Sequence, residues 1–317
     1  MTRWVVTGGA GYIGAHVVRS MIESGREAVV LDDLSTGFAE FVPPGVEFVQ
    51  GSLLDRASVR NALAEAVGVV HLAGWKYAGV SVDQPLDFYR ENVEGTRVLL
   101  EEAVTAGIPS FVFSSSASVY GTPDVDLVDE GTPVGPESPY GETKLAGEWL
   151  LRDVCRITRL RGVSLRYFNV VGSGSADLYD ASPHNLFPLV LAALKDGRPP
   201  NVHGDDYPTP DGSCVRDYIH VVDVADAHVA AVAALEAGRP VGAVYNLGRG
   251  EGVSVLEILD AFRRALGEDF PHTVGPRRPG DPARIVTSAA LAGADLGWSA
   301  KYDLDDMVTS AIAAAPH

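Results

Sequence analysis

Cysteine is scarce in the 317-residue sequence, which holds only Cys155 and Cys214. Two cysteines give no disulfide framework, so we expect a reducing compartment. Basic residues are also few: 25 Lys and Arg stand against 42 Asp and Glu, a net charge of −17. This balance argues against nucleic acid or an anionic membrane as the main partner, since both attract basic surfaces, although a locally basic site for a phosphate ligand stays open.

Long apolar runs are missing as well. The start, MTRWVVTGGAGYIG, has no long apolar stretch ending in a cleavage site, and no run of about 18 apolar residues follows. We therefore expect a cytoplasmic protein that is neither secreted nor membrane-spanning. Apolar residues still make up 46% and charged residues 21%, which is typical of a globular chain. The length predicts one large domain or two interlocked domains.

The first half alternates short runs rich in β-branched residues with longer helical patterns. Strands are predicted at 3–8, 27–33, 46–52, 68–74 and 110–116, and helices at 15–25, 58–67, 85–107 and 139–156. This order predicts an α/β fold with a doubly wound parallel sheet of the Rossmann type. Strands of such a sheet are buried on both faces, which explains runs such as AVVL and FVF.

The composition changes after residue 172, where Gly, Pro, Asp and Ser become frequent. This change predicts loops that shape a smaller C-terminal lobe. Further helices are predicted at 184–197 and 222–238, and a strand at 242–248 is expected to return to the main sheet. We therefore expect a first domain over 1–166, rejoined by 217–248, and a smaller lobe formed mainly by 167–317.

A glycine motif lies between the first strand and the first helix. TGGAGYIG places Gly8, Gly11 and Gly14 at three-residue intervals. Small residues permit a tight turn, and the helix N-terminus offers N–H groups to a pyrophosphate. Asp32 ends the next strand about 20 residues later, where a carboxylate can bind an adenine-ribose diol and repel a 2′-phosphate. The pattern predicts a dinucleotide site that prefers NAD over NADP; the alternative is an ordinary Gly-rich turn.

A tyrosine and a lysine four residues apart occur in SPYGETK. Ser138 and Pro139 are a typical helix start, which puts Tyr140 and Lys144 on one helical face. A phenol has a pKa of about 10, and a nearby ammonium together with a nicotinamide cation would lower it. Such a tyrosine can accept a proton from a substrate alcohol while hydride leaves to NAD. Ser116, at a strand end, is placed to bind the same oxygen; a solvated Tyr–Lys pair is the alternative.

These motifs together resemble the extended short-chain dehydrogenase/reductase superfamily and, within it, the UDP-glucose (UDP-galactose) 4-epimerases. The similar segments are TGGAGYIG, HLAGWKYAGVSVDQPLDFYRENVEGT, FSSSASVYG, SPYGETK, LRYFN, PHNLFPLVL, HGDDYPTPDGSCVRDYIHVVDVADAHV and RRPGD. GDDYPTPDG…VRDYIHV is the most discriminating of them. The resemblance implies a homodimeric isomerase with tightly bound NAD that interconverts UDP-glucose and UDP-galactose through a 4-keto intermediate. It makes 1–166 the NAD-binding domain and 167–317 the UDP-sugar lobe.

The resemblance also implies which residues form the site, and it implies no metal. The catalytic positions are Ser116, Tyr140 and Lys144. Those for the cofactor are Gly8, Gly11, Tyr12, Ile13, Gly14, Asp32, Asp33, Ser35, Gly37, Ser52, Leu53, Leu72, Ala73, Gly74, Lys76, Asn92, Ser114, Tyr140, Lys144 and Tyr167. Those for the substrate are Lys76, Ser116, Tyr140, Asn169, Asn185, Leu186, Asn201, His203, Arg216, Tyr218, Arg278 and Asp281. Guanidinium groups such as those of Arg216 and Arg278 pair well with diphosphate oxygens.

One related activity and one unrelated role compete with this interpretation. Nucleotide-sugar dehydratases typically carry an Asp-Glu pair after the active-site hydroxyl, whereas Ser116 is followed by Ala117 and Ser118. NAD-sensing regulatory proteins commonly lose the catalytic tyrosine, which this chain keeps. Both features favour an epimerase. Relatives pair through the helices that match 85–107 and 139–156, and Leu145, Trp149 and Leu150 fit either that surface or the monomer core.

Several positions depart from the epimerase pattern. Ser52 stands where an aspartate near the adenine is usual, Asp33 replaces an asparagine and Val80 replaces a glutamate. His203 lies where phenylalanine often packs on the uracil, and Ile285 lies near a position where a large tyrosine restricts the sugar pocket. The segment 172–185 as a whole departs from the family pattern. A UDP-N-acetylhexosamine or UDP-glucuronate 4-epimerase is therefore the alternative.

Overall fold

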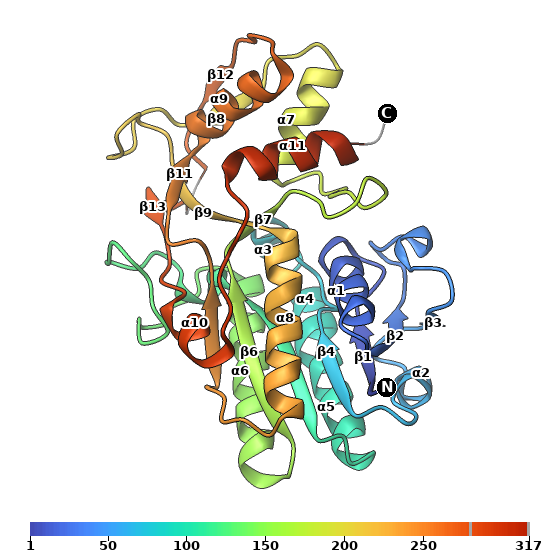
Figure 1. The fold of residues 1–317 in the computed structure, drawn as a ribbon. Helices are drawn as coiled ribbons and strands as arrows, with labels where there is room; N and C mark the ends of the chain where they lie inside the picture. The colour runs from blue at the N-terminus through green and yellow to red at the C-terminus, as the bar shows by residue number, and fades with distance from the viewer. Residues whose placement is uncertain (279–280, 316–317) are drawn as a thin grey trace.

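The computed structural model describes residues 1–278 and 281–315, so Pro279 and Gly280 of the RRPGD segment lie outside it. A seven-stranded parallel sheet forms the lower half in Figure 1, with strand order β10-β6-β5-β4-β1-β2-β3. The strands are β1 (Arg3–Thr7), β2 (Glu27–Asp32), β3 (Glu47–Gln50), β4 (Gly68–His71), β5 (Ser110–Ser116), β6 (Arg161–Tyr167) and β10 (Val244–Leu247). The predicted doubly wound α/β fold is confirmed.

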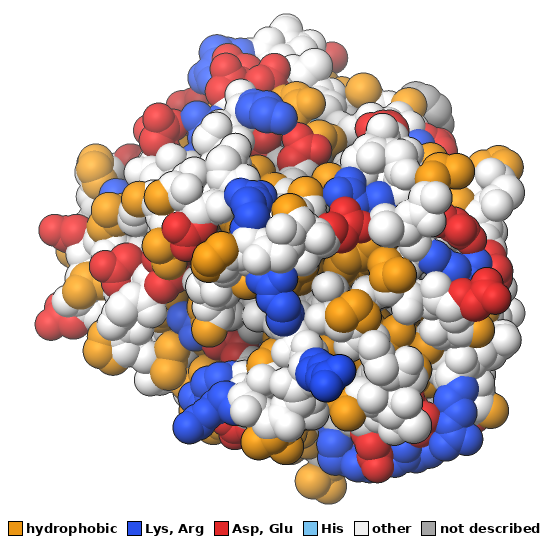
Figure 2. Space-filling model, turned by 60° about the horizontal axis from the view of Figure 1, so that its bottom comes forward, with side chains coloured by type: hydrophobic (Ala, Val, Ile, Leu, Met, Phe, Trp, Pro, Cys, Tyr) orange, Lys and Arg blue, Asp and Glu red, His pale blue; other side chains and the backbone are white. Residues whose placement is uncertain are grey.

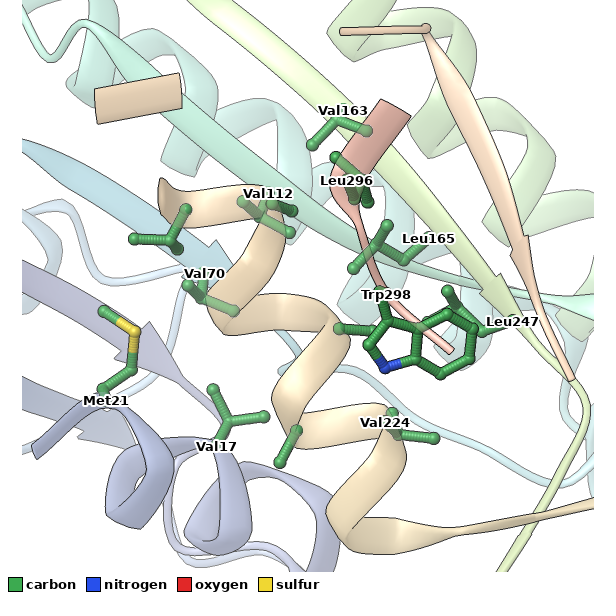
Figure 3. Packing of buried hydrophobic residues seen from close by; sticks show 14 of the residues in the cluster. Val17, Met21, Val70, Val112, Val163, Leu165, Val224, Leu247, Leu296 and Trp298 are labelled. Carbon is green, nitrogen blue, oxygen red and sulfur yellow. The ribbon is translucent and has the colours of Figure 1, made fainter. Parts of the chain in front are cut away.

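Helices cover both faces of this sheet because alternate residues of each strand point to opposite sides. One face packs on α1 (Tyr12–Glu23), α8 (Val221–Glu236) and α10 (Ala290–Leu296), and the other on α2 (Arg56–Ala62), α5 (Gly95–Thr105) and α6 (Pro139–Ile157). Figure 3 shows Val70, Val112 and Leu165 of the sheet against Val17 of α1 and Val224 of α8. Each such side chain contributes about 1.5–3 kcal/mol on full burial.

The helix predicted over 85–107 is not one regular α-helix. The structure has α3 (Ala78–Asp83), α4 (Pro85–Phe88), a π-helical turn over Tyr89–Glu94, and then α5. A π-helical turn rotates the side chains that follow it and is common at functional sites. Here it contains Asn92, which is buried and bonds to Trp75 and Thr143, so a tertiary contact accompanies the irregular turn.

The smaller lobe forms the upper half in Figure 1. Its four-stranded sheet contains β7 (Asn169–Val171), β9 (Val215–His220), β11 (Gly252–Ser254) and β13 (Arg284–Ile285), and β8 (Asn201–His203) pairs with β12 (Thr273–Gly275). Three helices pack there around a separate core: α7 (Leu186–Lys195), α9 (Val255–Leu266) and α11 (Leu304–Ala314). After β9 in the small sheet, the chain returns to the main sheet, where α8 packs on one face and β10 forms an edge strand.

The surface mixes charges of both signs, and the helices differ in how far their apolar side chains are buried. Figure 2 shows acidic and basic side chains mixed among apolar and uncharged ones on the face formed by the bottom of the molecule in Figure 1. Within 1–278 and 281–315, the chain has no helix with the length and apolar character needed to cross a membrane. Of the apolar residues on α6, Leu145 is buried, Leu150 packs partly against the core, and Trp149 is 49% exposed.

Candidate active site

A cavity of about 440 Å³ lies at the carboxyl ends of the main-sheet strands, where doubly wound folds bind their ligands. It brings together seventeen of the residues predicted for the cofactor. They are Gly8, Gly11, Tyr12, Ile13, Gly14, Asp32, Asp33, Ser35, Ser52, Leu53, Leu72, Ala73, Gly74, Lys76, Tyr140, Lys144 and Tyr167. One cavity therefore joins the glycine turn after β1 to the Tyr–Lys pair on α6.

The glycine turn leaves no room for a side chain at two positions. Gly8 has φ +71°, and a Cβ there would lie 2.7 Å from the Ala73 nitrogen. A Cβ at Gly14 would lie 2.0 Å from the Gly8 oxygen. α1 begins at Tyr12, and its N-cap residue, Gly11, provides no side-chain cap; the first turn holds no acidic residue. Its first N–H groups are therefore suited to a pyrophosphate, which agrees with an NAD site.

Asp32 ends β2 beside this turn. Its carboxylate accepts hydrogen bonds from the backbone N–H of Ala10 at 3.0 Å and of Leu34 at 2.9 Å. Burial raises the pKa of the Asp32 carboxyl above its ordinary value, and the two N–H groups oppose that shift. Each carboxylate oxygen has lone pairs beyond these bonds, so the group can also accept from a ribose diol.

Tyr140 and Lys144 lie in the first two turns of α6. Ser138 caps the helix, since its hydroxyl accepts from the Gly141 N–H at 3.2 Å. The Tyr140 N–H donates to the Ser81 hydroxyl at 3.0 Å, which fixes the helix start against α3. The Lys144 ammonium donates to the Ser114 carbonyl at 3.0 Å and lies 5.9 Å from the centre of the Tyr140 ring.

Burial controls the ionisation of both side chains. It raises the pKa of the Tyr140 phenol, and a hydrogen bond with Ser116 acts in the opposite direction. Burial also lowers the pKa of Lys144 to about 8, although the Glu148 carboxylate acts to raise it. The lowered Tyr140 pKa predicted from the sequence depends on a nicotinamide cation as well as on Lys144. In the chain by itself, burial dominates.

Four predicted residues support the cavity instead of lining it. Asn92 holds Trp75 through two backbone bonds, because its side chain accepts from the Trp75 N–H at 2.7 Å and donates to the Trp75 oxygen at 3.0 Å. Ser114 directs its hydroxyl to His228 at 2.8 Å. A Cβ at Gly37 would lie 3.0 Å from the Ala10 backbone, so this glycine permits a close approach of two loops. Ser116 caps the turn that follows β5.

The structure places the residues predicted for the substrate mainly in the small lobe, outside the cavity lining. Asn169 lies opposite Tyr218 in the β7–β9 pairing. Arg216, on β9, forms an ion pair with Asp281 at 3.3 Å. Asn185 and Leu186 lie at the start of α7, Asn201 and His203 lie on β8, and Arg278 is exposed. Lys76 and Tyr140 alone among this set also line the cavity.

Sequence reasoning missed about a dozen lining residues. They are Leu31, Thr36, Phe38, Phe41, Gly51, Trp75, Tyr77, Glu91, Tyr179, Asp180, Ala181, Ser182 and Pro183. Most are neighbours of predicted residues at the strand ends, so widening each motif by a few positions would have found them. The run 179–183 belongs to the segment that as a whole departs from the family pattern, and nothing local in the sequence indicated its position.

The departures from the epimerase pattern lie in different surroundings. Ser52 lines the cavity, and its hydroxyl accepts from the Leu54 N–H at 3.1 Å. Ile285 is 9% exposed and packs with Tyr120, Leu145 and Phe168 between the main sheet and the small one. Its β13 position pairs with Arg216.

Comparisons with known proteins agree with this geometry. A sequence profile of the NAD dependent epimerase/dehydratase family matches residues 4–248. The UDP-glucose 4-epimerase of Azospirillum brasilense is 44% identical over 98% of this chain and 91% of its own length. The structure of UDP-glucose 4-epimerase from Brucella ovis in complex with NAD superposes with a TM-score of 0.93, at 39% identity over 99% of this chain and 98% of that one.

A further structure carries a second sugar in its name. The UDP-Glc/GlcNAc 4-epimerase of Campylobacter jejuni is 34% identical and has a TM-score of 0.85, with 98% of both chains covered. The family profile spans more than half of the chain, and the relatives match it nearly from end to end. This chain therefore belongs to the NAD dependent epimerase/dehydratase family.

Proposed function

We propose that the protein is an NAD-dependent UDP-glucose 4-epimerase, an isomerase that interconverts UDP-glucose and UDP-galactose. The observation that carries the proposal is the meeting of Tyr140 and Lys144 with the glycine turn in one cavity. Relatives named UDP-glucose 4-epimerase match nearly the whole chain at 40–44% identity. A hydroxyl base beside a nicotinamide site is suited to reversible oxidation of an alcohol.

The residues present fit NAD. The uncapped start of α1 suits the pyrophosphate and Asp32 suits the adenine ribose, while Tyr140 and Lys144 border the part of the cavity left for the nicotinamide. A bound NAD would supply this site with an acceptor for the C4 hydride of the sugar and with the means to return it. The negative charge of Asp32 disfavours the additional phosphate of NADP.

Tyr140 is the proposed proton acceptor. It removes the proton of the sugar 4-hydroxyl as the C4–H bond breaks, so that a C4 carbonyl forms. Ser116 donates to the same sugar oxygen, and Lys144 stabilises the phenolate by its positive charge. When the keto sugar turns and presents its other face, Tyr140 returns the proton and the C4 configuration is inverted.

The small lobe is the proposed anchor for UDP. Arg216 and Arg278 would bind the diphosphate, and Asn169, Asn185, Leu186, Asn201, His203, Tyr218 and Asp281 would complete this part of the site. We likewise propose 1–166 with the returning segment as the NAD-binding domain and 167–317 as mainly the UDP-sugar lobe. Arg216 forms an ion pair with Asp281 in the chain, so a diphosphate bound by Arg216 would compete with this carboxylate.

Two features favour a broader substrate range as the second candidate. Ile285 is smaller than the tyrosine that restricts the sugar pocket in some family members, and the C. jejuni neighbour carries both UDP-Glc and GlcNAc in its name. Activity on a UDP-N-acetylhexosamine is therefore the first alternative and activity on UDP-glucuronate the next.

A homodimer formed through the helical run 85–105 and α6 is also part of the proposal, and the exposed Trp149 on α6 supports it. The unpaired Cys155 and Cys214 fit a cytoplasmic location.

The test of the function is direct. Purified protein is incubated separately with UDP-galactose, UDP-GlcNAc and UDP-glucuronate, and the products are resolved by NMR. We expect UDP-galactose to be converted to UDP-glucose without added NAD. If none of the three sugars is inverted at C4, the proposed function is wrong.

A further inference from the structure

The residues 175–184, here called the strap, connect β7 to α7 without a helix or strand of their own. Five consecutive strap residues, 179–183, form part of the cavity wall. Much of the remaining wall comes from the segments that follow the strand ends of the main sheet and from Tyr140 and Lys144. The strap therefore meets the cofactor half across the cavity, although it follows the first strand of the small lobe.

The beginning of the strap is tied to α1 by an ion pair. The Arg19 guanidinium donates two hydrogen bonds to the Asp177 carboxylate, at 2.5 and 3.1 Å. The same helix holds the approach to the strap, since His16 accepts from the Gly174 N–H at 2.9 Å and the Tyr12 hydroxyl donates to the Gly172 oxygen at 2.5 Å. α1 is the helix whose N-terminus faces the predicted pyrophosphate, so this end of the strap is fixed to the cofactor site itself.

The middle of the strap is tied by aromatic contacts. The Tyr179 ring lies 5.2 Å from that of Phe41, edge to face, and 5.9 Å from that of Phe38. Leu178 is fully buried beside Phe41 and Ala15. Phe38 and Phe41 belong to the loop that follows Asp32, and both line the cavity. The strap thus packs on the loop expected beside the adenine ribose.

The end of the strap is tied to the opposite side of the site. The His184 ring lies 4.6 Å from the Tyr77 ring, edge to face. Tyr77 has φ +86°, a backbone conformation that is unfavourable for a residue with a bulky side chain and persists only where surrounding contacts hold it. Tyr77 lines the cavity next to Lys76, whose ammonium lies 5.1 Å from the Tyr77 ring.

We propose that the strap is part of the cofactor site and sets the rate at which NAD leaves it. The proposal rests on the proposed function, because that function supplies the NAD. A dinucleotide bound in this cavity would leave it when the strap contacts with Phe41 and Tyr77 open. Such local opening is governed by the few contacts that hold the segment. An enzyme that takes back the same hydride in each turnover benefits from a cofactor that stays bound.

The test measures the release of NAD from the purified holoprotein. Alcohol dehydrogenase and ethanol in excess convert each released NAD to NADH, which is followed at 340 nm, so no epimerase activity enters the readout. Tyr179→Ala loses two aromatic contacts and His184→Ala loses one. We expect release to be roughly tenfold faster for Tyr179→Ala, several-fold faster for His184→Ala, and faster still for the double variant. Phe270→Ala, which removes a ring that stacks on Arg263 away from the cavity, is the matched control and leaves the rate unchanged.

Charge reversal at the Arg19–Asp177 ion pair distinguishes the loss of this one contact from a general loosening of the fold. Arg19→Asp and Asp177→Arg each place like charges together, so we expect release about threefold faster in each. The double variant restores an opposite pair and returns the rate towards that of the natural protein. If the single variants acted by loosening the whole fold, their effects on the release rate would add in the double variant and the rate would not return.

Three results contradict the proposal, and they are distinguishable. If acid extraction of the natural protein yields no NAD, both the proposed function and the proposed role of the strap are wrong. If NAD is present but Tyr179→Ala and His184→Ala release it at the natural rate, only the proposed role of the strap is wrong. The same holds if they release it faster but Phe270→Ala does so equally.

Discussion

The cofactor half and the small lobe build their parts of the site in different ways. In the cofactor half, the predicted residues follow parallel strands, whose carboxyl ends meet at one edge, so they converge in a single cavity. In the small lobe, the predicted residues lie on β7, β8, β9 and the start of α7, and Arg216 is already paired with Asp281. The predicted nucleotide site is thus formed by the backbone topology, whereas at the proposed UDP anchor Arg216 would have to exchange Asp281 for the diphosphate.

Replacing the proposed base gives the largest expected effect and tests the cofactor half at its chemical end. Tyr140→Phe removes the hydroxyl but keeps the ring, whose neighbour Phe88 lies 6.4 Å away. We expect turnover to fall by about 10³-fold or more, in the range of a lost general base, while the NAD content stays the same. The measurement is UDP-galactose conversion together with acid-extracted NAD per subunit. Full activity in the variant would remove Tyr140 from the mechanism.

Filling the glycine turn breaks the same half at its backbone. A Cβ at Gly14 would lie 2.0 Å from the Gly8 oxygen, so Gly14→Ala must displace the turn. We expect a loss of about 1–3 kcal/mol in the free energy of unfolding and a purified protein nearly free of NAD. The matched control is Gly135→Ala, where the new methyl group has no neighbour within 4 Å. Equal NAD content in both variants would contradict the preformed nucleotide site.

Lys144 carries a cost in stability within the cofactor half, because its ammonium is buried. Its folded-state pKa of about 8 lies below the 10.5 of an ordinary lysine, so between these values the folded chain binds fewer protons than the unfolded one. The free energy of unfolding therefore gains a contribution as pH rises from 8 to 10.5, and this contribution is absent below pH 8. Relative to Lys144→Met, the natural protein should gain roughly 3 kcal/mol across this window. Urea unfolding of both proteins at pH 7 and pH 10 measures this gain. An equal change in the free energy of unfolding of the two proteins would contradict the depressed pKa of Lys144.

Weakening the UDP anchor is expected to be the mildest change. Arg216→Lys keeps the charge but loses the forked geometry that suits a diphosphate. We expect KM for UDP-galactose to rise about tenfold with kcat and NAD content nearly unchanged, because the group binds substrate away from the reacting carbon. Steady-state kinetics beside Arg198→Lys, whose guanidinium pairs with Asp196 on the surface, supply the control. A fall in kcat at constant KM would place Arg216 in the chemistry instead.

Local motifs explain which parts of this account could be predicted from the sequence. The glycine turn, Asp32 and the α6 start are each specified within a few residues, and the strand order fixes where they meet. The position of Tyr179 against Phe41 and the unusual backbone of Tyr77 depend on contacts between distant segments. The π-helical turn around Asn92 has the same origin, since its side chain holds Trp75. Sequence periodicity carries no signal for such contacts.

Inversion at C4 by Tyr140 and bound NAD, with one hydride removed and returned, is the core of the proposed mechanism. It is tested most directly by converting UDP-galactose in D₂O and reading the C4 position of the product by NMR. Hydride held on the cofactor does not exchange with solvent, so the account predicts UDP-glucose with protium at C4. Deuterium at C4 would mean that the hydrogen left as a proton, and it would contradict the proposed mechanism.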